Sequence, residues 1–323
     1  MSGPYFEDLH AGAEFHAPAV TIDHGMQAVH RSILADRMPL SLDDELAYAV
    51  TGRRGLVHPA LVWNLAIGQS SVVTRHVVAN LFYRDLRLGQ PVAIGDTLNT
   101  TTTVLATRMA TVREGRPRRG LAALRIRTVD QRGGTVLDFG RCALLPLRDR
   151  SGSAEPSGPP ELLEAPVGQS TTPQLPDWAA NWSLDAARHI SDGADLRPGL
   201  ELVAPVGDVV SSAPELARLT LNVAAVHHDQ EAAGGQRLVY GGHTIGLALS
   251  QACRLLPGLI AVTEWFSCEH TGPVHEGDTI RSRVLIEDVQ LQPNGGRLAA
   301  LRVVVTADPD RPVLDWRFGA LIV

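Results

Sequence analysis

Two stretches of the chain are apolar on nearly all sides. They cover residues 59–73 and residues 243–256. A proline opens the first stretch, and Pro257 and Gly258 follow the second, as is typical of helix starts and ends. A helix without a polar face has to be buried on every side. The pattern therefore predicts two long helices, each wrapped by the rest of its half of the chain.

Runs rich in threonine, valine and other strand-forming residues follow each predicted helix. They cover residues 97–107, 122–129 and 136–145 after the first helix, and residues 280–289, 299–306 and 313–323 after the second. Turn-forming residues separate the runs, which favours antiparallel strands. One buried helix followed by several such strands predicts an α+β unit, and the chain contains this layout twice.

The two units are also related in sequence, because short blocks of the first recur in the same order in the second. The blocks that start at Leu9, Pro91, Leu121 and Val136 return at Leu196, Pro273, Leu298 and Val313. The separation between matched positions falls only from 187 to 177 residues, as small loop deletions would cause. Four matched blocks in one order indicate a tandem duplication.

The duplication divides the chain into two halves, residues 1–147 and residues 193–323. Between them, residues 148–192 begin with a stretch rich in proline, serine and glycine that has little periodicity, which is typical of a linker. Trp178 and Trp182 lie near the end of this linker, and we expect them to anchor it to the protein surface.

Composition narrows the class of protein. Of the 323 residues, 44% are hydrophobic and 20% are charged, and the net charge is −6, so a globular protein without a nucleic-acid surface is expected. The three cysteines are too scattered for a disulfide framework or a zinc motif. We find no signal peptide and no apolar run that could span a bilayer. A cytoplasmic protein that does not bind membranes is predicted.

One segment, residues 219–246, concentrates side chains that can carry chemistry. It contains Asn222, His227 and Asp229, followed by a turn of Tyr240, Gly241 and Gly242 that opens the second apolar helix. The first turn of a helix offers free backbone N–H groups, which suit a developing negative charge. An imidazole nearby can move a proton to or from a substrate or a water. The more ordinary expectation for Asp229 is a helix cap or loop residue.

The spacing in this segment resembles that of the MaoC-like (R)-specific enoyl-CoA hydratases, a family with a double hot-dog fold. In the family signature, Asp-x-Asn-Pro-Leu-His-x-Asp precedes a His-Gly turn at the start of the central helix. Asn222 keeps the five-residue step to His227 and the seven-residue step to Asp229, and Tyr240 takes the place of the histidine before Gly241. The resemblance implies a double hot-dog fold in which His227 is the catalytic base and acid.

The same resemblance assigns roles to the surrounding residues. The Gly241 N–H becomes an oxyanion-hole donor, and Asn222, which cannot transfer a proton at neutral pH, orients the water or the thioester. No metal or other cofactor is implied. The further candidates for binding the substrate are Gly242, Tyr240, Arg237 and Asp229.

The first half contains an altered copy of the motif. Asp36 and Pro39 match the signature, but Ser41 stands at the histidine position and Pro59 stands at the glycine position. Proline has no backbone N–H, so this copy lacks both the base and the oxyanion donor. We therefore expect the first half to line the substrate tunnel without catalysing the reaction.

These observations predict reversible hydration of a short 2-enoyl-CoA to the 3-hydroxyacyl-CoA. The blocks around Asn222 and Tyr240 are most similar to the branch that includes mesaconyl-CoA hydratase, which implies a branched or carboxylated acyl group. Two alternatives stay open, namely a hot-dog acyl-CoA thioesterase and a non-catalytic acyl-CoA-binding subunit. Asn222 in place of aspartate keeps the second alternative open. A homodimer is also expected, because hot-dog sheets often pair.

Two other groups of residues have weaker claims to a function. The arginines of one predicted hairpin could meet the CoA phosphates, although a solvated hairpin tip is the more ordinary explanation. They are Arg108, Arg113, Arg116, Arg118 and Arg119. The spacing of Cys268, His270 and His275 fits no standard metal site, so no metal is expected there.

Overall fold

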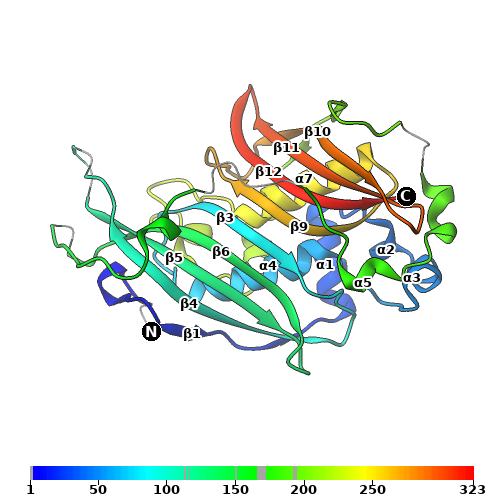
Figure 1. Cartoon of the computed structure of the whole chain (residues 1–323). Coiled ribbons are helices and arrows are strands. Elements are labelled where there is room, and N and C mark those ends of the chain that lie inside the picture. Colours follow the sequence, from blue (N-terminus) through cyan, green and yellow to red (C-terminus); the bar gives the residue numbers. More distant parts are fainter. Residues whose placement is uncertain (1–2, 113, 116, 150, 166–171, 192–194) are drawn as a thin grey trace.

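A computed structural model describes residues 3–112, 114–115, 117–149, 151–165, 172–191 and 195–323 (Figure 1). In the first half, the helices are η1 (Phe6–Asp8), α1 (His24–Leu34), α2 (Pro39–Leu42), α3 (Asp44–Thr51), α4 (Pro59–Gln69) and η2 (Ser70–Val72). The strands of this half are β1 (Glu14–His16), β2 (Val20–Thr21), β3 (Ala79–Leu88), β4 (Thr97–Met109), β5 (Arg119–Val129) and β6 (Thr135–Pro146).

The second half repeats this order with shorter helices before the central one. Its helices are α6 (Ala213–Leu219), η5 (Ala225–His227) and α7 (Gly241–Leu255). Its strands are β7 (Glu201–Val203), β8 (Asp208–Val209), β9 (Leu259–Glu269), β10 (Thr279–Leu291), β11 (Arg297–Ala307) and β12 (Arg311–Ile322). No helix in the described residues is long and apolar enough to cross a membrane.

All the strands join one antiparallel sheet that covers the two central helices. Its order is β1-β4-β5-β6-β3-β9-β12-β11-β10-β7, with β2 paired to β4 and β8 paired to β10. The two halves meet at β3 and β9, where Tyr83 lies opposite Cys268. Figure 1 shows α4 and α7 on the same side of the sheet, and these two helices contact each other. The predicted α+β architecture, a buried helix wrapped by antiparallel strands in each half, is confirmed.

The structure corrects the predicted elements at three places. The second central helix begins at Gly241 rather than at residue 243. The strands β3 and β9 were not predicted, although they hold the two halves together. The predicted linker contains the short helices η3 (Pro160–Leu163), α5 (Asp177–Ala180) and η4 (Leu184–Ile190), while its residues 166–171 and 192–194 lie outside the described part.

The linker is attached to the protein by its tryptophans. The Trp178 indole N–H donates to the Leu88 carbonyl at 2.9 Å, and its ring lies 5.2 Å from that of Trp182. Both rings pack beside an apolar cluster that includes Ile260 and Leu321 at the end of the second half.

Aromatic side chains fill the centre of the seam between the halves. Trp63 from α4 contacts the rings of Trp265 and Trp316 edge to face, at 5.0 Å and 6.1 Å. Phe318 stacks on Trp316 at 4.0 Å. Such pairs add about 0.5–1.5 kcal/mol each beyond the area that they bury. The two halves therefore share one hydrophobic core.

Hydrogen bonds confirm how the two central helices correspond. Gln69 in α4 accepts a hydrogen bond from Thr100 in β4, and Gln251 in α7 accepts one from the main chain of Ser282 in β10. Each glutamine lies ten positions after the first residue of its helix, Pro59 or Gly241. Pro59 and Gly241 are therefore matched positions.

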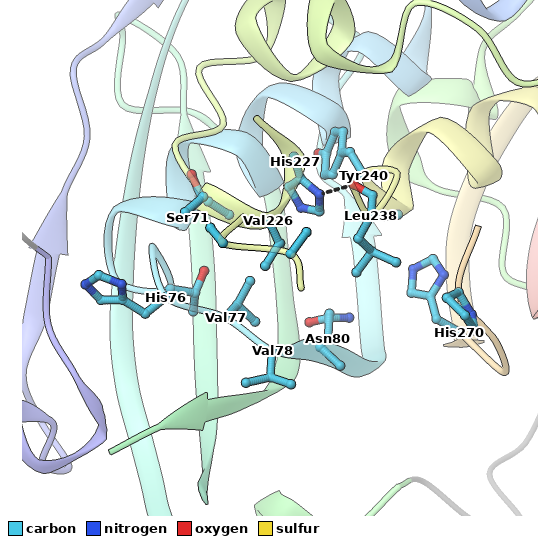
Figure 2. Close-up of a pocket in the computed structure, with 18 of the residues that line it drawn as sticks. Ser71, His76, Val77, Val78, Asn80, Val226, His227, Leu238, Tyr240 and His270 are labelled. Carbon is cyan, nitrogen blue, oxygen red and sulfur yellow. Dashed lines mark hydrogen bonds between the residues drawn. The ribbon is translucent and has the colours of Figure 1, made fainter. Parts of the chain in front are cut away.

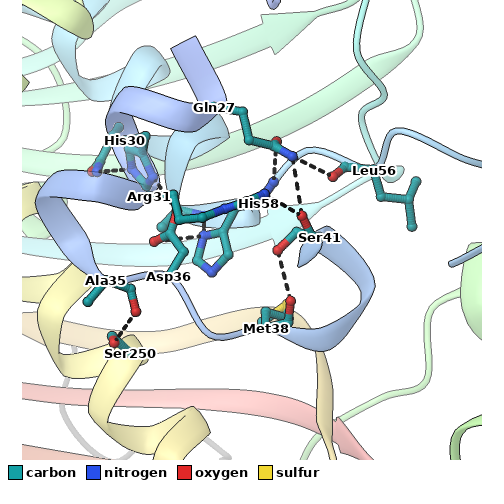
Figure 3. A network of polar contacts seen from close by, with 12 residues as sticks. Gln27, His30, Arg31, Ala35, Asp36, Met38, Ser41, Leu56, His58 and Ser250 are labelled. Atoms are coloured by element: carbon teal, nitrogen blue, oxygen red, sulfur yellow. Dashed lines mark hydrogen bonds and ion pairs between the residues drawn. The ribbon is translucent and has the colours of Figure 1, made fainter. Parts of the chain in front are cut away.

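The altered motif of the first half lies in a buried polar network (Figure 3). Asp36 is 2.7 Å from His30 Nδ1, and the Ser41 hydroxyl donates to the Met38 carbonyl at 2.9 Å. His58 lies immediately before α4 and its Nδ1 accepts from the Ala60 N–H at 3.2 Å. Ligand atoms of His30, Asp36 and His58 lie within 4.8 Å of one another, a spacing at which a metal ion can be held. The hydrogen bonds leave Asp36 Oδ1 and His58 Nε2 without a partner among the described residues.

This network and its neighbourhood make the stability of the protein sensitive to acid. Burial lowers the pKa of His58 to about 4, against the raising effect of Asp36, and lowers the pKa of His243 to about 3. In the unfolded chain both return to about 6.5, so the unfolded state binds more protons below that pH. The contribution of these two neutral histidines to the free energy of unfolding is therefore fully present above pH 6.5. It decreases as the pH falls toward the native pKa values.

We predict that the thermal midpoint decreases as the pH is lowered from about 6.5 to about 4. The reason is that the free energy of unfolding decreases by about 1.4 kcal/mol per pH unit for each such histidine. Thermal unfolding followed by circular dichroism at a series of pH values checks this. His243→Leu introduces the residue that the first half has at the matched position, Leu61, and should make the dependence shallower. A midpoint that is constant over this range would contradict the prediction.

A second prediction concerns the close approach of α4 to the segment that leads into the candidate site. A Cβ at Gly68 would overlap the carbonyl oxygen of Thr220, which is main chain and cannot rotate away. Gly68→Ala is expected to lower the free energy of unfolding by about 1–3 kcal/mol, measured by urea unfolding. Gly246→Ala in α7 is the control, because the atoms that its Cβ would approach most closely belong to the Leu34 side chain and not to main chain. Equal losses in the two variants would refute this explanation.

Candidate active site

A cavity of about 1020 Å³ lies between the two halves. It opens beside the region where the chain leaves α4 and enters β3, and it faces the loop that precedes α7 (Figure 2). From the first half it is lined by residues that include Ser71, Thr74, Asn80, Tyr83 and Arg141. From the second half it is lined by residues that include Asn222, His227, Tyr240, Gly241 and His270.

His227 is held in one orientation by the main chain. Its Nδ1 lies 2.8 Å from the carbonyl oxygen of Leu238 (Figure 2), and the Leu238 N–H in turn donates to the Val226 carbonyl at 3.0 Å. A carbonyl oxygen can only accept, so Nδ1 carries the proton. The lone pair of His227 is therefore on Nε2, in a side chain that lines the cavity.

The surroundings keep this imidazole uncharged. Burial lowers the pKa of His227 to about 4, ahead of the raising effect of the Leu238 hydrogen bond. The neighbouring charges of His228 and Arg141 lower it further. At neutral pH the ring is therefore a neutral base with a free acceptor nitrogen.

Gly241 is the first residue of α7 and also lines the cavity. The first N–H groups of a helix have no partner within the helix, and the side chain of the N-cap residue, Tyr240, accepts none of them. A Cβ at Gly241 would lie 2.5 Å from His270 Nε2, so a larger residue would not fit between the helix start and that ring. The helix start is thus available to an anion.

Asn222 shapes the turn that carries His227. Its Oδ1 accepts from the Ala224 N–H at 2.9 Å, and its main-chain carbonyl accepts from His228 Nε2 at 2.6 Å. The next residue is tied across the cavity wall, because the Val223 N–H donates to the Ser71 hydroxyl at 2.7 Å. Asn222 therefore lines the site and also fixes its backbone.

Two other predicted residues belong to the helix start but differ in what they face. The Tyr240 hydroxyl donates to the Asn64 carbonyl at 2.8 Å, and its ring lines the cavity 5.7 Å from that of His227. Gly242 does not line the cavity; a Cβ there would overlap the Asn64 side chain in α4. Gly242 serves the close packing of the two central helices.

Arg237 and Asp229 were predicted to bind substrate, but the structure places both outside the cavity lining. Arg237 lies 3.5 Å from Glu276 as a half-exposed ion pair. The exposed Asp229 accepts from the Glu231 N–H at 2.8 Å, as a loop cap does. Arg237 is paired with Glu276, which is distant in the sequence, and Asp229 caps its own loop, and their positions in the sequence do not reveal these contacts.

The structure adds residues that sequence analysis did not assign to the site. Arg141, Tyr83 and Asn80 come from strands of the first half, and His270 directly follows β9. Burial lowers the pKa of His270 to about 4, and repulsion between protonated His227 and protonated His270 lowers it further. The Nε2 of His270 has no hydrogen-bond partner among the described residues. Strand alternation in residues 136–145 was the available signal for Arg141, since it puts this arginine on the core-facing side.

Three arginines that are exposed or partly exposed also line the cavity. Arg118 and Arg119 at the start of β5, and Arg148 after β6, line its outer part. Arg148 also forms an ion pair with Asp8 at 2.6 Å. Arg108 does not line the cavity and forms an ion pair with Glu164 at 2.9 Å. Arg113 and Arg116, the other members of the predicted basic loop, lie outside the described residues.

The matched region of the other half is almost filled. A pocket of about 50 Å³ lies there, lined by residues that include Ser41, Val57 and Pro59. Trp178 and Trp182 of the linker also line it. Of these two matched regions, the one beside His227 therefore contains the wide cavity.

Comparison with known proteins agrees with this geometry. The chain is similar to β-methylmalyl-CoA dehydratase of Chloroflexus aurantiacus, with 30% identity over 98% of this chain and 91% of that protein. It is also similar to mesaconyl-CoA hydratase of Cereibacter sphaeroides, with 28% identity over 96% of this chain and 91% of that protein. No protein-family model matches the chain.

Solved structures confirm the fold. A conserved hypothetical protein of Mycobacterium tuberculosis with a double hot-dog fold superposes with a TM-score of 0.90 at 45% identity, over 100% of this chain and 99% of that one. A MaoC domain protein dehydratase from Chloroflexus aurantiacus superposes with a TM-score of 0.84 at 25% identity, over 99% of this chain and 97% of that one. The chain therefore belongs to the MaoC-like family of double hot-dog hydro-lyases, the hydratases and dehydratases of CoA thioesters.

Proposed function

We propose that the chain catalyses the reversible hydration of a short 2-enoyl-CoA at the cavity beside His227. The observation that carries this proposal is the 2.8 Å hydrogen bond from His227 Nδ1 to the Leu238 carbonyl oxygen. It leaves Nε2 as a free base in a cavity that also contains the start of α7. Hydration of a conjugated thioester requires a base and a site for the enolate oxygen.

In the hydration direction, His227 Nε2 removes a proton from a water while the water oxygen attacks the β-carbon. The electron pair of the carbon–carbon double bond moves toward the thioester, and its oxygen becomes an enolate. His227 then returns its proton to the α-carbon, so a hydrogen and a hydroxyl have been added and the imidazole is neutral again. Asn222 carries no transferable proton at neutral pH and orients the water or the thioester.

The enolate oxygen binds at the Gly241 N–H in this proposal. The N-terminus of a helix carries a partial positive charge, and the loss of one oxyanion donor costs about 10²–10³ in rate. The first half has Pro59 at the matched position and Ser41 in place of the histidine, and its pocket measures about 50 Å³. We therefore assign one catalytic site to each chain. In this proposal the first half lines the substrate cavity without catalysing the reaction.

The names of the relatives support a short acyl group with a second carboxylate, since mesaconyl and β-methylmalyl groups are of that kind. The proposed partner is thus a small acyl-CoA. Its phosphates would be bound by Arg118, Arg119 and Arg148 at the mouth of the cavity. No step of this reaction uses a metal or another cofactor.

The first test replaces the base. His227→Ala should lower kcat/KM for hydration of crotonyl-CoA or mesaconyl-CoA by about 10²–10⁴-fold, because the attacking water loses its proton acceptor. The reaction is followed as loss of the conjugated enoyl absorbance. His189→Ala, at an exposed position in η4, is the control and should keep full activity. Near-normal activity in folded His227→Ala protein would exclude the proposed role.

The same assay separates hydration from the two alternatives. A thioesterase would release a free thiol that a colorimetric reagent detects, whereas hydration releases none. A binding subunit would show saturable binding of enoyl-CoA esters with no turnover.

The pH dependence supplies a further prediction. Because burial lowers the pKa of His227 to about 4, kcat/KM should stay level from neutral pH down to about pH 5 and then decrease as Nε2 becomes protonated. Short assays after a pH jump avoid the acid unfolding described above. An acid limb near the ordinary histidine value of about 6.5 would contradict the proposed environment of this ring.

A further inference from the structure

We infer that Arg141 binds a carboxylate on the acyl group, so that the site selects CoA thioesters of dicarboxylic acids. This inference rests on the proposed function for the thioester part of the ligand. Arg141 lies in β6, is 5% exposed and lines the cavity. An arginine can hold a carboxylate with two parallel N–H···O hydrogen bonds.

Arg141 has no counter-ion among the residues that the structure describes. Its Nη1 donates to the Ser70 hydroxyl at 2.9 Å and its Nη2 donates to the Thr74 hydroxyl at 2.6 Å. Its Nε is buried and has no partner, and no carboxylate of the described residues forms an ion pair with it. A buried charge is costly unless it is paired, and two neutral hydroxyls do not neutralise it. A ligand carboxylate would complete the site.

The second half shows that the fold does not require a charge at this position. Its matched strand has Phe318 where β6 has Arg141, since Leu124 and Leu301 lie opposite them in the matched registers. The positions that match Ser70 and Thr74 are Ala252 and Leu256. All three counterparts are buried apolar side chains in the aromatic seam or next to it. The polar set of Arg141, Ser70 and Thr74 therefore occurs in the first half and has no polar counterpart in the second.

The position of Arg141 suits the acyl end of the ligand rather than its phosphates. Arg141 and His227 both line the cavity, and the charge of Arg141 contributes to lowering the pKa of His227. Pro146, at the mouth, lies five residues further along β6, which corresponds to about 17 Å of strand. The exposed arginines at that end can meet the phosphates while Arg141 meets a group close to the reacting carbons.

A second side chain in the cavity also lacks a partner. Neither the oxygen nor the nitrogen of the Asn80 amide has a hydrogen bond among the described residues, although both atoms are buried. Figure 2 shows Asn80 in the same pocket as His227 and His270. Tyr83, directly opposite Arg141 in the neighbouring strand, lines the cavity as well. This wall therefore offers polar groups to a polar acyl group.

The test compares a carboxylated with an uncarboxylated substrate in Arg141→Met. We expect kcat/KM for mesaconyl-CoA to fall by about 10²-fold or more, and kcat/KM for crotonyl-CoA to stay within about threefold of wild type. Arg141→Lys keeps the charge without the two-pronged geometry and should fall in between. Arg125→Met is the control, since Arg125 lies on the outer side of β5 in an ion pair with Asp138. Equal losses with both substrates would overturn the inference.

A binding measurement keeps this test independent of turnover. Succinyl-CoA and butyryl-CoA are saturated and cannot be hydrated, and calorimetry gives their Kd values. Wild-type protein should bind succinyl-CoA more tightly, and Arg141→Met should abolish the preference. If no enoyl-CoA is hydrated but the preference and its loss are seen, the proposed function fails and the role of Arg141 stands. If enoyl-CoA is hydrated without such a preference, the role of Arg141 fails alone.

The folded state of the variant is checked separately. Removing an unpaired buried charge should not lower the thermal midpoint of the ligand-free protein. If Arg141→Met does not fold, Arg141→Gln retains donors for Ser70 and Thr74 and is compared in the same way. A glutamine variant that keeps the succinyl-CoA preference would overturn the inference.

Discussion

The antiparallel pairing of β3 with β9 is the constraint on which the rest of the structure depends. It turns two similar sheets into one, and the twist of the strands curves that sheet around α4 and α7. The end of α4 in one half is thereby placed across from the loop before α7 in the other. Neither half could form the cavity alone, because its base and its opposite wall come from different halves.

The seam between the two halves has two matched regions, one of which is packed while the other contains a cavity. In one of them, Trp63, Trp265 and Trp316 occupy the space, and the linker tryptophans cover what is left, a pocket of about 50 Å³. In the other, Tyr83 and Arg141 stand at the positions of Trp265 and Phe318, and about 1020 Å³ stays open. Stability and chemistry are thus divided between two copies of one arrangement, with dense aromatic packing in the first and polar groups in the second.

Sequence reasoning predicted the features that depend on local periodicity. The buried helices, the repeat and the cluster of Asn222, His227 and Gly241 all follow from short-range patterns. The strand β3 escaped because Asp85 adopts a positive φ of 52° and shifts the register there, which breaks the alternation. The direction of Arg237 and the role of Arg141 depend on contacts between distant segments. So does the tautomer of His227, which the Leu238 carbonyl determines.

The small size of the pocket beside Pro59 has a consequence for how the substrate preference of such a protein can evolve. In a pair of identical subunits, any substitution appears in two sites at once, so a charge that helps one pocket must be tolerated in the other. Here the charge of Arg141 occurs once, while the matched Phe318 stays in the hydrocarbon interior. Because the two halves are covalently linked, the cavity of one region can acquire a new substrate preference while the matched region keeps the packing that stabilises the protein.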